Sequence, residues 1–322
     1  MRTLRARTHI VVIIAMAGVS SIPCQTGVSQ SPASDSAAFA RDGHVNRGDF
    51  ELFYRVVGDH GPLVVILAGG PGGEPTYMQP VLERLRGTYQ CLLLEQRGTG
   101  RSKLTAYNSR TITFQHYLDD LEALRQHLRV PKLLLIGHSW GGMLALSYAG
   151  TFPNRVRAVV SIDAGPIAEE HAIAEEANAI RRLEHNGQIL VESEKRKASD
   201  ATAAFGAIQR ATLPAYFFDP QKAVGAATWL TGDPNLEVMR LGYEPPFGSL
   251  HSFIRSRLRA ITAPVLLVHG RQDAVAEGGV AEAHQLIKRS KLVLIDKCGH
   301  LPWIEEPGQM WPAVESFLTA LP

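Results

Sequence analysis

The chain has 322 residues, of which 45% are hydrophobic and 20% are charged. This balance excludes a disordered chain, a collagen-like repeat and a coiled coil. Its 33 Lys and Arg residues against 31 Asp and Glu residues give a net charge of +2, which does not indicate a nucleic-acid-binding surface. Three cysteines are too few for a disulfide scaffold. We expect a soluble globular enzyme with a large core.

The first 40 residues differ in composition from the rest of the chain. Three arginines within the first seven residues precede an apolar run over residues 10–19, and small and polar residues follow. This order is typical of a secretory signal peptide, and the run is shorter than the ~20 residues of a membrane-spanning helix. We expect a signal peptide and tether over residues 1–40 and an exported protein, secreted or periplasmic. An uncleaved anchor and a lipid anchor at Cys24 are the less favoured alternatives, the latter because Pro23 replaces the usual small residue.

Short apolar runs alternate with helical patterns along the rest of the chain. The alternation predicts an α/β fold, a mostly parallel sheet with helices on both faces. An antiparallel strand is expected at residues 50–57. The other expected strands are 63–67, 91–94, 132–136, 158–162, 265–269 and 292–295, and the expected helices are 78–86, 114–128, 143–150, 281–288 and 309–320.

The alternation stops near residue 166 and resumes near residue 264. The intervening stretch is helix-rich and lacks buried strand runs. We therefore expect a core made of residues 41–165 and 260–322, with an inserted helical cap over residues 166–259 above the carboxyl edge of the sheet.

The two remaining cysteines are expected to be free thiols. Cys91 begins one expected strand and Cys298 follows another, which places them at opposite edges of a parallel sheet. Four residues at ~3.3 Å each separate those edges by more than a disulfide can span.

A motif typical of catalytic serines follows the expected strand at 132–136. The sequence Gly-His-Ser139-Trp-Gly joins this strand to the next expected helix, which is the strand–turn–helix context of a nucleophile elbow. Small residues must flank the serine in so sharp a turn, and the helix N-terminus favours developing negative charge. Ser139 is the predicted nucleophile, and His138 is expected to point elsewhere. The alternative is an ordinary glycine-rich turn.

A serine nucleophile needs a general base and a carboxylate that orients the base. Asp273 and His300 follow the last two expected strands, which gives the chain order Ser, Asp, His that accompanies this type of elbow. Asp163 and Asp296 are competing acids. We favour Asp273, because Asp296 lies too close to its own strand to reach His300.

Backbone N–H groups must stabilise the oxyanion that such a reaction forms. The amide of Trp140 follows the serine and is one candidate. The second should come from the glycine-rich loop after the strand at 63–67, with Gly70 favoured over Gly69. A phosphate-binding loop is the alternative interpretation, but no Lys-Ser/Thr pair follows. No metal-binding spacing is present, so neither a metal nor another cofactor is expected.

Together these motifs resemble the α/β-hydrolase superfamily and, within it, the proline iminopeptidase branch of serine peptidases. The resemblance covers residues 45–165 and 260–320. It implies a Ser139–His300–Asp273 triad and a helical cap that closes the substrate pocket. The motifs that carry it are Gly69-Gly-Pro-Gly72, Glu95-Gln-Arg-Gly-x-Gly-x-Ser102, Gly137-His-Ser-Trp-Gly-Gly142, Gly270-x-x-Asp273 and Gly299-His300.

The chain departs from that branch at several positions. Ala68 stands where the branch has His, and Glu95 stands where it has Asp. Cap glutamates of the branch hold the free amino group of the substrate, one of them in a Trp-Glu pair that is missing from this chain. Glu237 and Glu244 are the candidate substitutes. Aromatic residues of the expected cap could instead line an apolar acyl pocket, namely Tyr216, Phe217, Phe218 and Trp229.

Three functions follow from these features. The first is an aminopeptidase that releases N-terminal proline, or another small or apolar residue, from short peptides. The second is a carboxylesterase or lactonase with the same triad. The third is a noncatalytic binding protein, which the complete set of catalytic residues disfavours. Dehalogenase and epoxide-hydrolase mechanisms are excluded because they need an Asp nucleophile where this chain has Ser139.

Overall fold

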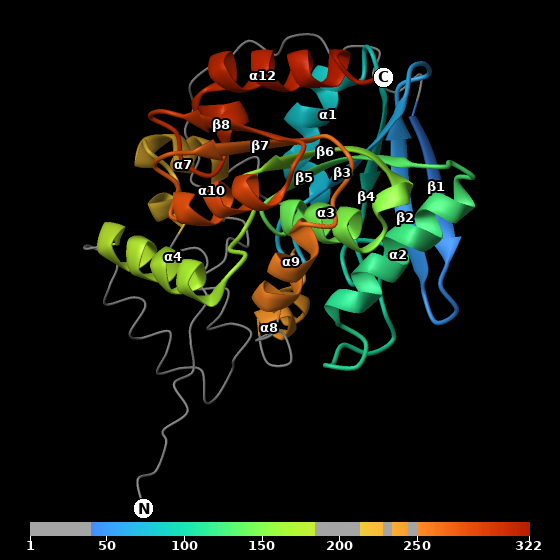
Figure 1. Ribbon diagram of the computed structural model, residues 1–322. Helices are drawn as coiled ribbons and strands as arrows, with labels where there is room; N and C mark the ends of the chain where they lie inside the picture. Colours follow the sequence, from blue (N-terminus) through green and yellow to red (C-terminus); the bar gives the residue numbers. More distant parts are fainter. Residues whose placement is uncertain (1–39, 184–212, 228–233, 244–249) are drawn as a thin grey trace, which may run out of the picture.

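The computed structural model describes residues 40–183, 213–227, 234–243 and 250–322 (Figure 1). The expected signal peptide with Cys24, part of the expected cap, and the candidates Trp229 and Glu244 lie outside these ranges. None of the helices in the described ranges has the length and apolar character needed to cross a membrane.

An eight-stranded sheet forms the centre of the molecule, with the strand order β1-β2-β4-β3-β5-β6-β7-β8. The strands from β3 to β8 pair in parallel, whereas β1 pairs antiparallel with β2 and β2 pairs antiparallel with β4. The expected mostly parallel sheet with an antiparallel start is thus confirmed. The strands are β1 (Ala40–Asn46), β2 (Glu51–Val57), β3 (Leu63–Leu67), β4 (Gln90–Leu94), β5 (Leu133–His138), β6 (Val156–Ile162), β7 (Val265–Gly270) and β8 (Ser290–Ile295).

Strand β1 is the strand that the sequence pattern did not predict. It begins at Ala40, within the stretch expected to be a loose tether. Only Val45 of its seven residues is buried, so it lacks the apolar alternation that marks a half-buried strand. Its place at the sheet edge depends on antiparallel pairing with β2, supported by an ion pair between Asp42 and Arg55.

Helices cover both faces of the sheet, as expected (Figure 1). Successive residues of a strand point to opposite faces, so Val65 packs in the core with α2 and α3, and Val64 packs in the core with α1 and α12. The helices outside the chain between β6 and β7 are α1 (Gln79–Leu85), α2 (Phe114–His127), α3 (Trp140–Thr151), α10 (Glu277–Leu286), α11 (Pro302–Glu305) and α12 (Pro307–Thr319).

The chain between β6 and β7, residues 163–264, is called the β6–β7 segment below. Its described residues form helices and no strand. The last helix packs on α3 and buries Leu250, Ile254 and Leu258 in the main core. The elements of the segment are α4 (Glu169–Arg182), η4 (Leu213–Tyr216), α7 (Pro220–Ala227), α8 (Leu236–Tyr243) and α9 (Leu250–Leu258).

Parallel pairing brings the ends of distant strands together. Leu67 pairs with Gly137, His138 with Ile162, and Ile162 with Val268. The chain leaves β3 toward β4 on one side and leaves β5 toward β6 on the other, so the carboxyl ends of β3 and β5 flank a switch in strand order. Ligands of open α/β sheets bind at such a point.

Both described cysteines are free and buried, as expected. Cys91 lies in β4 and Cys298 lies in the loop after β8. Burial raises the pKa of the Cys91 thiol to about 12, so this group is a protonated core side chain at neutral pH.

Candidate active site

Ser139 occupies a sharp turn between β5 and α3. Its backbone has φ 54° and ψ −121°, a conformation that a residue with a side chain adopts only when its surroundings enforce it. The surroundings leave no room for a side chain two residues before or two residues after the serine. A β-carbon on Gly137 would lie 2.1 Å from the carbonyl oxygen of Gly141, and one on Gly141 would lie 2.2 Å from that of Leu67. The turn therefore has the geometry of the nucleophile elbow predicted from the sequence.

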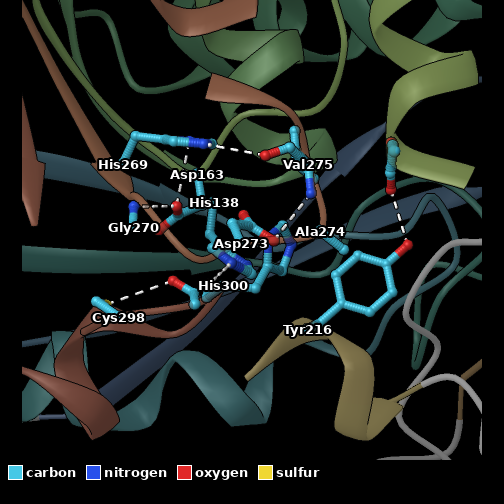
Figure 2. Close-up of polar contacts among 12 residues, drawn as sticks. His138, Asp163, Tyr216, His269, Gly270, Asp273, Ala274, Val275, Cys298 and His300 are labelled. Carbon is cyan, nitrogen blue, oxygen red and sulfur yellow. Dashed lines mark hydrogen bonds and ion pairs between the residues drawn. The ribbon is translucent and has the colours of Figure 1, made fainter. Parts of the chain in front are cut away.

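His300 and Asp273 form a buried pair at the same edge of the sheet (Figure 2). The Nδ1 atom of His300 lies 2.5 Å from Oδ2 of Asp273, and both side chains are almost fully shielded from solvent. The other oxygen of Asp273 accepts the amide hydrogen of Val275 at 3.1 Å. Burial lowers the pKa of His300 to about 3, so its imidazole is neutral at pH 7 and can act as a base.

The two competing acids lie elsewhere. Asp296 is exposed and forms an ion pair with Arg271 at 2.9 Å. Asp163 is fully buried behind the pair, where its Oδ1 accepts the amide hydrogen of Gly270 at 2.8 Å. The structure thus brings Asp273, and neither competitor, into hydrogen-bonding contact with the His300 ring.

His138 does not point away from the site as the sequence analysis expected. Its Nε2 donates to the backbone carbonyl of His300 at 2.8 Å, and the two ring centroids are 4.6 Å apart. Its Nδ1 accepts the hydroxyl hydrogen of Tyr77 at 2.8 Å. The register of β5 places the side chain of His138 on the α1 and α12 face, where the His300 loop also lies. Burial lowers the pKa of His138 well below 6.5. The imidazole is therefore neutral, with its one ring hydrogen on Nε2.

The loop after β3 passes directly beside the elbow. A β-carbon on Gly69 would lie 3.1 Å from the β-carbon of Ser139. The amide of Gly69 donates to the Tyr77 hydroxyl, so this alternative oxyanion donor has another role. Gly70 follows with φ 125°, a conformation open to glycine. Gly70 comes next along this loop and Trp140 begins α3 directly after Ser139, and their role as oxyanion donors stays a prediction.

The β6–β7 segment holds the loops that carry Asp273 and His300. Arg182 of α4 donates to the carbonyl oxygens of Ala215 at 2.9 Å and of Gln272. On the same helix, Asn178 donates to the carbonyl oxygen of Ala274 at 3.2 Å. The carbonyl oxygen of Tyr216 accepts the amide hydrogen of His300 at 2.7 Å.

Two buried glutamates near the site had no sequence signal. Glu175 of α4 accepts the hydroxyl hydrogen of Tyr216 at 2.8 Å, and burial with the nearby Asp273 charge raises its pKa to about 8. Glu305 of α11 accepts the amide hydrogens of Gly299 at 2.6 Å and of Asp219 at 3.0 Å. Both stabilise segments next to His300, and only the folded chain brings them there.

The candidate substrate-binding residues fall in different places. Tyr216 is buried against His300, with ring centroids 5.4 Å apart, and Phe217 is buried in the α1 and α12 core. Phe218 is 47% exposed. Glu237 forms an ion pair with Arg240 at 2.6 Å within α8.

Within the described residues, one cluster has the spacing of a metal site, namely Asp163, His269 and Asp273. Each member has a protein partner at one or more of its polar atoms, although Oδ2 of Asp163 and Nδ1 of His269 have no hydrogen-bond partner among the described residues. His269 Nε2 donates to the carbonyl oxygen of Val275 at 3.1 Å, Asp163 accepts from Gly270, and Asp273 holds His300. Asp273 is the predicted triad acid, and Asp163 and His269 lie next to it.

Comparisons with known proteins agree with this geometry. The family model described as alpha/beta hydrolase fold matches residues 62–307. A proline iminopeptidase of Lactobacillus helveticus is 28% identical over 286 residues, covering 84% of this chain and 94% of the relative.

Solved structures show the same fold at lower identity. A proline iminopeptidase-related protein of Thermus thermophilus superposes with a TM-score of 0.69 at 22% identity, covering 88% of this chain and 98% of that one. The enol-lactonase of Burkholderia xenovorans superposes with a TM-score of 0.63 at 17% identity, covering 86% of this chain and all of that one.

Proposed function

This chain belongs to the alpha/beta hydrolase fold family, and we propose that it is a serine hydrolase that works through an acyl-enzyme. Ser139 attacks the scissile carbonyl carbon while His300 takes the hydroxyl proton. The amides of Gly70 and Trp140 stabilise the oxyanion, and the proton then passes to the leaving group as the carbonyl re-forms. Water attacks the acyl-enzyme in the same way and releases the acid. The observation that carries the proposal is the buried His300–Asp273 pair, with a contact of 2.5 Å, at the same edge of the sheet as a strained serine elbow.

An active-site label tests this mechanism directly. A fluorophosphonate should label the wild type, and Ser139→Ala should abolish the labelling. Ser256 is exposed near the end of α9 and far from the elbow in sequence, so Ser256→Ala is a matched control that should label as the wild type does. A wild type that resists labelling while remaining folded contradicts the proposal and favours a binding protein.

For the substrate, we propose a short peptide from which the enzyme releases N-terminal proline or another small or apolar residue. The support comes from the curated relatives, which are named proline iminopeptidases and match over most of both chains. The β6–β7 segment, which contacts both triad loops, would act as a cap that excludes folded proteins from the pocket.

The second candidate is an esterase or lactonase. It is favoured by the ion pair between Glu237 and Arg240, which engages one of the two candidate amino-group anchors, and by the superposition with the enol-lactonase. Proline p-nitroanilide should be compared with a series of p-nitrophenyl esters. Turnover of the anilide supports the aminopeptidase, whereas ester turnover with no anilide turnover at high enzyme concentration excludes it.

A further inference from the structure

The triad acid has a second carboxyl group directly behind it. Asp163 and Asp273 follow the neighbouring strands β6 and β7, and both are buried. One oxygen of each, together with one ring nitrogen of His269, lies within 4.8 Å of the others. Figure 2 shows His269, Asp163 and Asp273 grouped next to His300. Two ionised carboxylates this close in a dry site repel strongly, so the pair should hold one proton.

Hydrogen-bond donors decide which carboxyl group carries the charge. Asp273 accepts the Nδ1 hydrogen of His300 and the amide hydrogen of Val275. Asp163 accepts one amide hydrogen on Oδ1, and its Oδ2 is buried without a hydrogen-bond partner among the described residues. A buried anion needs several donors, so the charge belongs on Asp273.

The contacts of His269 also indicate that Asp163 is the neutral member of the pair. Its Nε2 points at the carbonyl oxygen of Val275 at 3.1 Å, so the ring hydrogen of the neutral imidazole sits on Nε2. The bare Nδ1 then faces Oδ1 of Asp163 at 3.3 Å. Two lone pairs at this distance repel less when the carboxyl group is neutral. Burial lowers the pKa of His269 to about 4, so a charged imidazole does not supply the missing proton.

We propose that Asp163 is the neutral, proton-bearing member of a buried acid pair, and that its carboxyl group donates a hydrogen bond that holds Asp273 as the anionic partner of His300. Asp163 is then a positioning residue, which touches no substrate. The inference rests on the proposed triad. Burial raises the pKa of both carboxyl groups well above the ordinary value, whereas the interaction between them raises the pKa of Asp163 and lowers that of Asp273, which agrees with the assignment.

Other charged or titratable groups also face the pair, and the test must leave them in place. They are Arg182 and Glu175 from α4, Glu305 from α11, His269 from β7, and Cys298 and His300 from the loop after β8. Of these, Arg182 is the cation, and it favours the anionic form of Asp273.

Asp163→Asn is the decisive variant. An amide can accept from Gly270 and donate to Asp273 as a neutral carboxyl group does, and asparagine tolerates the φ of 42° found at this position. We expect kcat/KM, or the rate of fluorophosphonate labelling, to stay within about threefold of wild type, with an unchanged acid limb of the pH profile. A loss comparable to that of Asp273→Asn would show that Asp163 carries the charge, and would overturn the proposal.

Asp163→Ala removes the donor. Asp273 then loses a hydrogen bond that disperses its charge and interacts more strongly with the imidazolium form of His300, so the acid limb should move to higher pH. A variant that folds with an unshifted acid limb would mean that Asp163 only fills space, which contradicts a positioning role.

An infrared difference spectrum reads, without any turnover, whether the acid pair holds a proton, and the activity of Asp163→Asn then shows which member carries the charge. Wild type minus Asp163→Asn at neutral pH should show the carbonyl band of a neutral carboxylic acid. A carboxylate band in its place overturns the inference. Because this readout needs no substrate, it separates failure of the acid pair from failure of the proposed function, which the labelling of Ser139 reports.

Discussion

The nucleophile and its two partners are held by different parts of the chain. Ser139 is fixed by the sheet and its glycines, because Gly137 and Gly141 pack against backbone atoms of the core itself. The loops of Asp273 and His300 contact the core through His138 and Glu305, but they are also bonded to α4 and η4 of the β6–β7 segment. The elbow is therefore a property of the core, whereas the alignment of acid and base depends on a segment inserted between two strands.

The largest effect should come from breaking the acid–base pair itself. Asp273→Asn replaces the carboxylate that accepts the Nδ1 hydrogen of His300, and a loss of about 10⁴-fold in kcat is expected, as in other serine triads. The matched control is Asp296→Asn, an exposed acid at the same edge of the sheet. Equal losses in the two variants would show that Asp273 has no special role.

The next largest effect should come from disturbing the serine elbow, which the core holds in place. Gly141→Ala places a methyl group 2.2 Å from the carbonyl oxygen of Leu67, which should cost about 1–3 kcal/mol of stability. A displaced elbow should also slow labelling of Ser139 on the order of 10²-fold. Gly87→Ala is the control, because no atom lies within 4 Å of the added carbon. An unchanged melting temperature and labelling rate for Gly141→Ala would refute the close packing of the elbow.

Two adjacent arginines of α4 test whether the β6–β7 segment aligns Asp273 with His300. Arg182→Met removes donors to the acid loop and a cation near Asp273, and kcat should fall roughly tenfold with little change in KM, as expected for the loss of a charged hydrogen bond. Arg181→Met changes the neighbouring side chain, which contacts Asn178 at 3.4 Å, and should behave as wild type. If both variants lose the same activity, general damage to α4 explains the loss.

A smaller effect is expected at Tyr77, whose hydroxyl group joins the loop after β3 to His138. Tyr77→Phe removes the hydroxyl group that accepts the Gly69 amide hydrogen and donates to His138. An unsatisfied buried amide costs about 1–3 kcal/mol, and kcat should fall a few-fold because the oxyanion loop and the His300 loop lose their link. Tyr89→Phe, in the same core but at the amino end of β4, is the control for stability. Wild-type stability and rate in Tyr77→Phe would show that the link has no consequence.

The smallest effect concerns pH. The neutral form of His300 is the base, and burial lowers its pKa to about 3. Activity should therefore be lost only as the pH falls through a value well below the ordinary imidazole pKa of about 6.5, and kcat/KM should be nearly flat between about pH 8 and about pH 6. An acid limb at or above the ordinary imidazole pKa would show that His300 is less shielded than the structure indicates.

Local sequence patterns were enough to predict the sheet, the elbow and the chain order of the triad. Strand and helix patterns depend on a few neighbouring residues, so the sequence alone predicts them. The glycines around Ser139 are likewise predictable, because the turn itself has no room for larger side chains at those positions. The polar edge strand β1 was missed because pairing with β2, rather than its own composition, makes it a strand.

Sequence reasoning favoured Asp273 as the acid that meets His300, but only the tertiary structure showed their contact and the surroundings of the pair. Asp163 and Asp273 follow strands in the same way, and sequence reasoning could rank them but not separate their roles. Tyr77, Glu175 and Arg182 contact partners 61, 41 and 90 residues away. No periodicity encodes such contacts, because they arise where loops from different strands meet at one edge of the sheet.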